Sequence, residues 1–215
     1  MIHKFHNERP DLTDFFSAGA GNDTIRGGAG NDIINAGSGD DTIFGEEGND
    51  RLFGHSGDDL ISGGLGDDWI EGESGDDVLR GDEGNDILLG GAGKDVLTGG
   101  AGVDTLTGNA GADIFVLQRI SDSGVGIGNR DTMTDFATNA DQISLVSIDA
   151  NTTTTGDQAF TFIATAAFSG RAGQLRFTVA GGQTIVEGDV DGDAVADFQV
   201  QLTGIVKLVA DHFVL

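Results

Sequence analysis

The sequence predicts an all-β protein, in which a right-handed parallel β-roll of nonapeptide repeats is capped by a C-terminal antiparallel β sheet or sandwich. A nine-residue repeat runs without a gap over residues 18–116. Each repeat contains a three-residue segment with an apolar middle residue, which is the alternation of a β-strand. From Leu117 the repeat stops, and the sequence shows the apolar runs and turn residues of antiparallel strands. We therefore divide the chain into an N-terminal segment (1–17), the repeat region (18–116) and a C-terminal β domain (117–215).

Three positions define the repeat, and eleven consecutive copies keep all of them. A glycine recurs every nine residues from Gly21 to Gly111, and a bulky apolar residue follows four positions later, from Ile25 to Phe115. An aspartate stands midway between them: Asp23, Asp32, Asp41, Asp50, Asp59, Asp68, Asp77, Asp86, Asp95, Asp104 and Asp113. Such regularity is not a product of chance.

Each nonapeptide separates into a glycine-rich hexapeptide and a tripeptide, as in "GGLGDD" (63–68) followed by "WIE" (69–71). The tripeptide is expected to form a short strand with its middle side chain inward, and the hexapeptide a loop whose glycines permit positive φ. Two nonapeptides then close one coil of about 18 residues, stacked on the next at a spacing of ~4.8 Å. The inward residues form two facing columns, which make a thin core.

The charge balance is strongly acidic, with 36 Asp and Glu against 11 Lys and Arg and a net charge of -25. This charge argues against nucleic acid and anionic membrane surfaces as partners. No apolar run approaches the roughly 18 residues of a membrane span, so stable membrane insertion is not expected. The chain has no cysteine, which excludes disulfides and thiolate metal sites. Residues 1–16 contain no apolar signal-peptide core, so an N-terminal secretory signal is not expected.

The acidic residues of the repeat crowd onto a glycine-rich backbone, and such a chain repels itself. Residues 66–86 alone contain nine carboxylates. Either this region is disordered, or a cation that the sequence does not encode lies among the acids. Disorder does not require an apolar residue at every ninth position, so a cation-dependent fold is the favoured interpretation.

The repeat resembles the GGxGxDxUx nonapeptide of the RTX family. The resemblance implies a parallel β-roll with Ca²⁺ at both edges, held between loops two repeats apart by backbone carbonyls and by the eleven repeat aspartates. Oxygen ligands on a flexible glycine loop suit Ca²⁺ better than Mg²⁺ or Zn²⁺. Eleven loops paired in this way allow at most 11 − 2 = 9 sites. Fewer are expected to fill, because the residue before the aspartate changes to Lys94, Val103 and Ala112 late in the repeat.

The C-terminal part resembles the C-terminal domain of serralysin-type secreted metalloproteases, through "RDTMTDF" (130–136), "GDQAFTF" (156–162) and the ending "DHFVL" (211–215). The resemblance implies a secreted, extracellular protein. Its partner would be a bacterial type I ABC exporter, which reads an uncleaved signal at the extreme C-terminus. Asp211 and the apolar Phe213, Val214 and Leu215 fit this signal, although His212 interrupts the usual acid–aromatic pair. A monomer is expected.

Two further acidic clusters are candidate metal sites. The first has the spacing of a D-x-D-x-D calcium loop and comprises Asp189, Asp191, Asp193 and Asp197. Ala194 stands where such loops use glycine, so a polar hairpin loop is the alternative. The second cluster flanks the end of the roll and comprises Asp122, Asp131 and Asp135, as candidates for one more ion.

The sequence contains no catalytic constellation. None of its four histidines begins the H-E-x-x-H-x-x-G-x-x-H zinc motif of serralysins, and a G-x-S-x-G elbow is absent. The chain itself is therefore predicted not to be an enzyme. The leading hypothesis is a calcium-binding module that folds on Ca²⁺ binding after type I export. One alternative is the detached C-terminal part of a secreted metalloprotease or RTX lipase, with the catalytic domain in a longer parent. The other is a structural or adhesive extracellular module.

Overall fold

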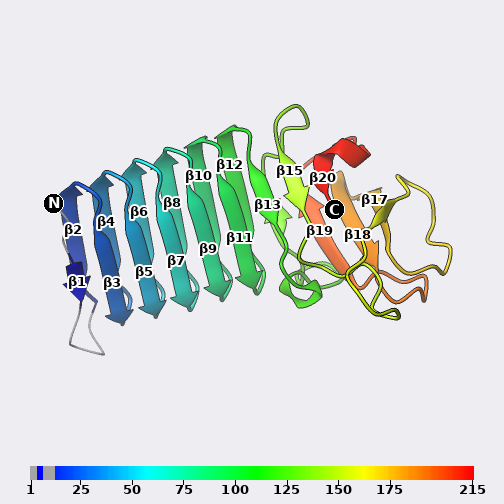
Figure 1. The fold of residues 1–215 in the computed structure, drawn as a ribbon, viewed down its shortest axis with the longest axis horizontal. Coiled ribbons are helices and arrows are strands. Elements are labelled where there is room, and N and C mark those ends of the chain that lie inside the picture. The colour runs from blue at the N-terminus through cyan, green and yellow to red at the C-terminus, as the bar shows by residue number, and fades with distance from the viewer. Residues whose placement is uncertain (1–3, 7–12) are drawn as a thin grey trace.

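The computed structural model describes residues 4–6 and 13–215, and residues 1–3 and 7–12 of the predicted N-terminal segment lie outside them. The described chain is an elongated stack of strands with the C-terminal part at one end (Figure 1). Almost all its regular structure is β; the exceptions are two short 3₁₀ turns, η1 (Ile120–Asp122) and η2 (Ala210–His212). In the described part, no helix is long and apolar enough to cross a bilayer.

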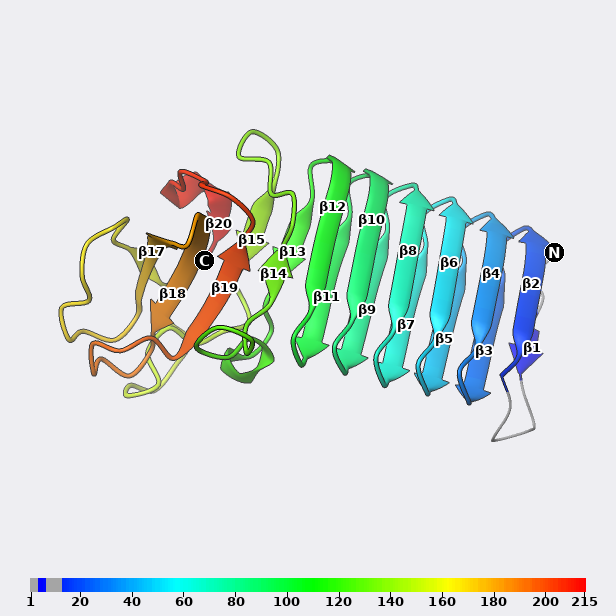
Figure 2. The ribbon, with the colours of Figure 1, turned by 180° about the vertical axis from the view of Figure 1, so that it is seen from behind.

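Two sheets face each other along the stack (Figures 1 and 2). The first is entirely parallel, in the order β1 (Lys4–His6), β3 (Thr24–Ala29), β5 (Thr42–Glu47), β7 (Leu60–Leu65), β9 (Val78–Glu83), β11 (Val96–Ala101), β13 (Ile114–Val116), β15 (Gln142–Ser144) and β20 (Phe213–Val214). The second has the order β16 (Thr161–Phe162), β17 (Gln174–Ala180), β18 (Gln183–Asp189), β19 (Phe198–Leu202), β14 (Thr132–Met133), β12 (Thr105–Gly111), β10 (Ile87–Gly93), β8 (Trp69–Ser74), β6 (Arg51–Ser56), β4 (Ile33–Ser38) and β2 (Phe15–Ala20).

Strands on one side of the roll pair in a fixed register of eighteen residues, so that Leu88 lies beside Ile70 and Leu106. This register confirms that two nonapeptides close one coil. The inward columns are also confirmed, because all eleven apolar residues from Ile25 to Phe115 are at most 1 % exposed. The sequence period thus places one aspartate per repeat immediately before each strand, at the edge of the roll.

The strands are longer than the predicted tripeptides. Most span six residues and include the first three residues of the loop, as Gly63, Gly64 and Leu65 in β7. The backbone bends at the second loop position, where φ is positive, yet pairing with the next coil continues through it. Glu46, at φ 81°, is one of five non-glycine residues that take this left-handed conformation within the repeats.

The strand stack extends beyond the repeat period at both ends. Before residue 18, β2 begins at Phe15 and pairs with β4 in the eighteen-residue register. After residue 116, β15 and β20 continue the first sheet, and β14 and β19 continue the second. The predicted antiparallel cap is present as β17, β18 and β19, with the predicted hairpin turning at Gly181–Gly182. It joins the roll edge-on through the pairing of β19 with β14.

Candidate metal centres

All eleven repeat aspartates are buried at the loop edges of the roll, with side chains 0–3 % exposed. One carboxylate oxygen of each, Oδ1, has a defined role from Asp32 onward. It accepts a hydrogen bond from the backbone N–H of the residue eighteen positions earlier, as from Asp50 to Asp68 at 2.7 Å. The same bond recurs along both edges at 2.7–3.0 Å. Each aspartate therefore ties its coil to the coil before it.

The second oxygen, Oδ2, has no hydrogen-bond partner among the described residues in any repeat from Asp32 to Asp113, and it is buried in each of them. A buried carboxylate oxygen without a partner is strongly unfavourable unless a positive charge compensates it. Ten such atoms in two rows exceed what a stable fold tolerates. The chain offers no basic side chain at these positions, so the geometry calls for a cation.

The space beside Oδ2 matches a cation in the six loops that begin with Gly27, Gly45, Gly54, Gly63, Gly72 and Gly81. This space is bounded by the first glycine of a loop, by Oδ2 of the aspartate that ends the same loop, and by the carbonyl oxygen of the first glycine two repeats on. We call it the cradle. A Cβ atom built on Gly27 would lie 2.6 Å from Oδ2 of Asp32 and 2.7 Å from the carbonyl oxygen of Gly45. These distances are too short for carbon but close to the about 2.3–2.6 Å of calcium–oxygen ligation. Hard oxygen donors alone line the cradle, which fits Ca²⁺.

Burial raises the pKa values of these carboxyl groups in the ion-free fold. Desolvation is the largest cause, and the backbone N–H bond to Oδ1 opposes it only in part. The pKa of Asp59 and of Asp68 rises to about 7, and that of Asp86 to about 8. Repulsion from the next aspartates in the row adds to the shift. A divalent cation in the cradle would reverse this preference and hold the carboxylates charged.

Residues 11–117 match the family model of the RTX calcium-binding nonapeptide repeat, in six overlapping segments: 11–43, 35–70, 44–79, 53–88, 62–97 and 89–117. Residues 11–117 of this chain are RTX calcium-binding nonapeptide repeats. The predicted calcium-binding repeat family is thus confirmed. The resemblance of the C-terminal part to serralysin-type metalloproteases stays a prediction.

Solved structures with a similar fold come from enzymes. The AlgE6R2 subunit of the Azotobacter vinelandii mannuronan C5-epimerase is 26 % identical, with a TM-score of 0.51 over 72 % of this chain and 91 % of that one. The extracellular lipase LipA from Serratia marcescens has a TM-score of 0.50 at 18 % identity, so its likeness concerns the fold alone. The match covers 94 % of this chain but only 38 % of the lipase. No curated protein sequence matches this chain.

A second row of side chains runs along the RTX repeats, and its role was not predicted from the sequence. The residue before the aspartate is exposed from Asn22 to Lys94. From Asn22 to Asn85 its Oδ1 accepts the backbone N–H eighteen residues later, at 2.8–3.2 Å. This ladder runs in the opposite direction to the aspartate ladder. It ends where Lys94 and Val103 donate their N–H groups but have no acceptor side chain to continue it. The recurrence of Asn or Asp at this position in the sequence could have predicted this second ladder.

Both aspartate ladders end on residues outside the RTX period. Asp131 accepts the N–H of Asp104 at 3.0 Å, and burial raises its pKa to about 8. Asp141 accepts the N–H of Asp113 at 3.0 Å and that of Ala137 at 2.7 Å. Asp141 was missed, because its spacing from Asp113 is 28 residues instead of 18.

The cluster of Asp122, Asp131 and Asp135 is divided between two edges of the roll. Asp122 accepts the N–H groups of Gln118 and Arg119 and closes the turn at η1 on the edge that holds Asp131. Asp135 lies at the other edge, where its two oxygens accept the N–H groups of Gly108 and Asn109. The three carboxylates therefore do not gather around one ion.

The loop between β18 and β19 brings together Asp189, Asp191 and Asp197, whose carboxylate oxygens all lie within 4.8 Å of one another. Asp193 is not in this group. Asp189 is buried, and its oxygens accept the N–H groups of Gly192 and Ala194. Ala194 adopts the left-handed conformation, at φ 70°, that glycine would supply in a calcium loop. The geometry suits either a cation or a hydrogen-bonded hairpin loop.

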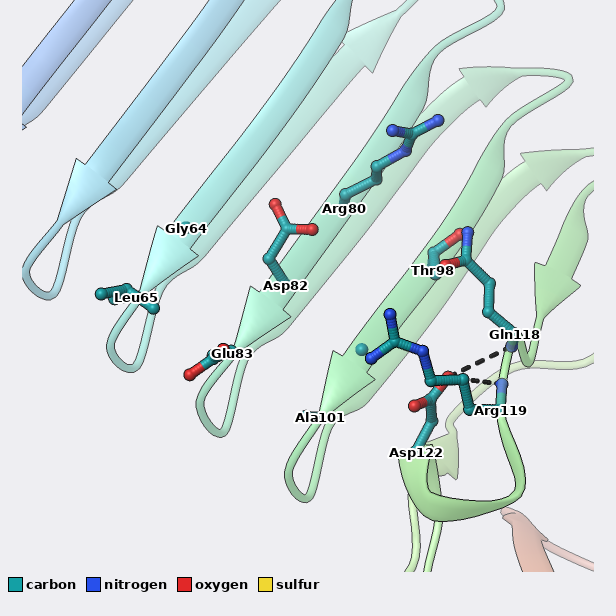
Figure 3. A pocket seen from close by; sticks show the side chains of 11 residues that line it. Gly64, Leu65, Arg80, Asp82, Glu83, Thr98, Ala101, Gln118, Arg119 and Asp122 are labelled. Atoms are coloured by element: carbon teal, nitrogen blue, oxygen red, sulfur yellow. Dashed lines mark hydrogen bonds between the residues drawn. The ribbon is translucent and has the colours of Figure 1, made fainter.

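An open pocket of about 370 Å³ lies where the η1 turn packs beside β9 and β11 (Figure 3). Arg80 and Arg119 line it, but Asp82 and Glu83 line it too, so it has no single charge preference. The carboxylate of Asp122 at its edge is already occupied with backbone N–H groups. The pocket therefore shows no feature of a catalytic or anion-binding site.

Proposed function

We propose that this chain is a calcium-binding RTX module that remains unfolded in the calcium-poor cytosol, leaves through a type I exporter and folds when it meets extracellular Ca²⁺. The main support for this proposal is the double row of buried Oδ2 atoms, from Asp32 to Asp113, that have no hydrogen-bond partner among the described residues. Without a cation these atoms oppose folding, and with one they favour it.

The ladders make this folding cooperative. Each coil contributes only two inward apolar side chains, so a single coil buries too little surface to stand alone. Each cradle draws ligands from two coils, as Asp32 and Gly45 show. An ion bound there would stabilise both coils, and its binding free energy becomes folding free energy. The aspartate Oδ2 atoms and the glycine carbonyls would hold the ions, which supply the positive charge.

The predicted secretion signal is part of the folded sheet. Phe213 and Val214 form β20, which pairs with β15, and the ring of Phe213 packs 5.1 Å from that of Phe162. Phe213 is only 7 % exposed. An exporter that reads these residues needs them undocked, which supports export before folding.

Removal of residues 211–215 is expected to abolish export of the chain from a bacterial host that carries a type I exporter. The measurement is the amount of the protein in the medium relative to the cells, by immunoblot. Phe162→Ala serves as the control, because it weakens the docking of Phe213 but leaves the last five residues intact. It should be exported at wild-type level. Undiminished export of the truncated chain would contradict the role of the C-terminus.

The likeness to a subunit of the epimerase supports a second candidate, a non-catalytic module attached to an extracellular enzyme. In that case the catalytic domain belongs to a longer parent protein, and the module would fold in the same calcium-dependent way. Both candidate functions predict that this chain alone hydrolyses neither casein nor lipid esters in activity assays.

A further inference from the structure

The first position of the hexapeptide loop is glycine in nine of the eleven RTX loops and alanine in the other two, Ala18 and Ala36. For all nine glycines, a Cβ atom would come within 2.6 Å of Oδ2 of the aspartate five residues later. For six of them it would also come close to the carbonyl oxygen of the glycine two repeats on. The absent side chain is thus what keeps the cradle open.

Ala36 occupies this position on β4 and is completely buried. Five residues later lies Asp41, whose Oδ1 accepts the N–H of Asp23 at 2.7 Å and whose buried Oδ2 has no hydrogen-bond partner in the described chain. Because β4 and β6 pair in the eighteen-residue register, the carbonyl of Gly54 corresponds to that of Gly45 in the cradle of Gly27. The methyl group of Ala36 therefore points into the cradle formed with Asp41 and Gly54.

We infer that Ala36 closes its cradle, so that the position beside Asp41 binds Ca²⁺ at least a hundredfold more weakly than the glycine-lined positions on the same edge. This inference rests on the proposed calcium-binding function. A methyl group has no electrons to donate to the ion and occupies the volume that the ion needs.

Ala18 occupies the same first position in the first loop. Ala18 and Ala36 lie on one edge of the roll, eighteen residues apart, whereas every loop described on the other edge between residues 27 and 104 begins with glycine. Of the nine positions between paired loops, 9 − 2 = 7 then begin with glycine, and the carbonyl oxygen that completes the cradle lies close at six of them.

The test is the number of Ca²⁺ ions bound by the full chain, measured by equilibrium dialysis with ⁴⁵Ca²⁺ at free Ca²⁺ tenfold above the dissociation constant of the wild-type sites. Ala36→Gly should add one ion. Gly54→Ala closes the next cradle on the same edge and should remove one. Ala92→Gly is the matched control, because Ala92 is exposed at the third loop position, and its ion count should equal that of the wild type.

The outcomes separate the two claims. If the wild type binds several ions and Ala36→Gly adds none, the inference is wrong while the proposed function stands. A Gly54→Ala variant that keeps its full count would overturn the inference independently of how Ala36→Gly folds. If the wild type binds no Ca²⁺ at all, the proposed function itself fails.

Discussion

Asp68→Asn is expected to remove one bound Ca²⁺ and to shift the calcium midpoint of folding several-fold upward. Asp68 lies in the middle of one ladder, where its Oδ1 accepts the N–H of Asp50 and its own N–H binds Asp86. Asparagine keeps the size and one acceptor oxygen but lacks the charge that the ion requires. At free Ca²⁺ ~100 times the dissociation constant, a lost site costs about 2.7 kcal/mol of folding free energy. Urea unfolding at fixed free Ca²⁺ measures this loss.

The control for this prediction is Asp157→Asn, which makes the same charge change at an exposed residue outside the roll. It should leave the calcium midpoint and the ion count unchanged. If the two variants behaved alike, the effect would come from net charge, and the ladder aspartates would not be the ligands.

Acid is expected to stabilise the calcium-free roll. The pKa of Asp59, Asp68 and Asp95 rises to about 7 and that of Asp86 to about 8 in the fold, all above the ordinary 3.8. Raised carboxyl pKa values mean that the folded state binds protons more tightly than the unfolded state. Their favourable contribution is therefore complete below about pH 4 and is lost as the pH rises through 6 to 8. Protonated carboxyl groups remove the repulsion that calcium would otherwise neutralise.

The chelated chain should consequently contain more β structure at pH 5 than at pH 8, as measured by far-UV circular dichroism in excess chelator. Because protons and Ca²⁺ compete for the same carboxylates, the calcium midpoint should move in the opposite sense and rise as the pH falls from 8 to 5. A calcium midpoint that is independent of pH over this range would show that buried carboxylates do not carry the binding.

The repeat region was predictable in detail because its contacts follow the sequence period. Once Gly66, Asp68 and Ile70 are assigned to loop, edge and core, the same assignment holds nine residues on. Every coil repeats the hydrogen bonds of its neighbour, so both the aspartate rows and the core columns can be placed without coordinates. The six-residue strands were not foreseen, because pairing persists through a bend that is read as loop.

Beyond Leu117 the sequence allowed only the strand type and the hairpin at Gly181–Gly182 to be predicted. Asp141 completes a ladder from 28 residues away, and only the path of the intervening chain decides this. For the same reason Asp122 and Asp135, which are close in sequence, lie at different edges. A side chain's role there depends on non-local packing, which no period records.

Far-UV circular dichroism during a Ca²⁺ titration of the chelated chain at pH 8 shows whether the roll folds only with calcium. We expect a cooperative transition from a coil spectrum to a β spectrum, at the ~10⁻⁴–10⁻³ M Ca²⁺ typical of extracellular sites, which Mg²⁺ does not reproduce. A β spectrum that persists unchanged in excess chelator would contradict it, because the roll would then stand without ions beside its buried aspartates.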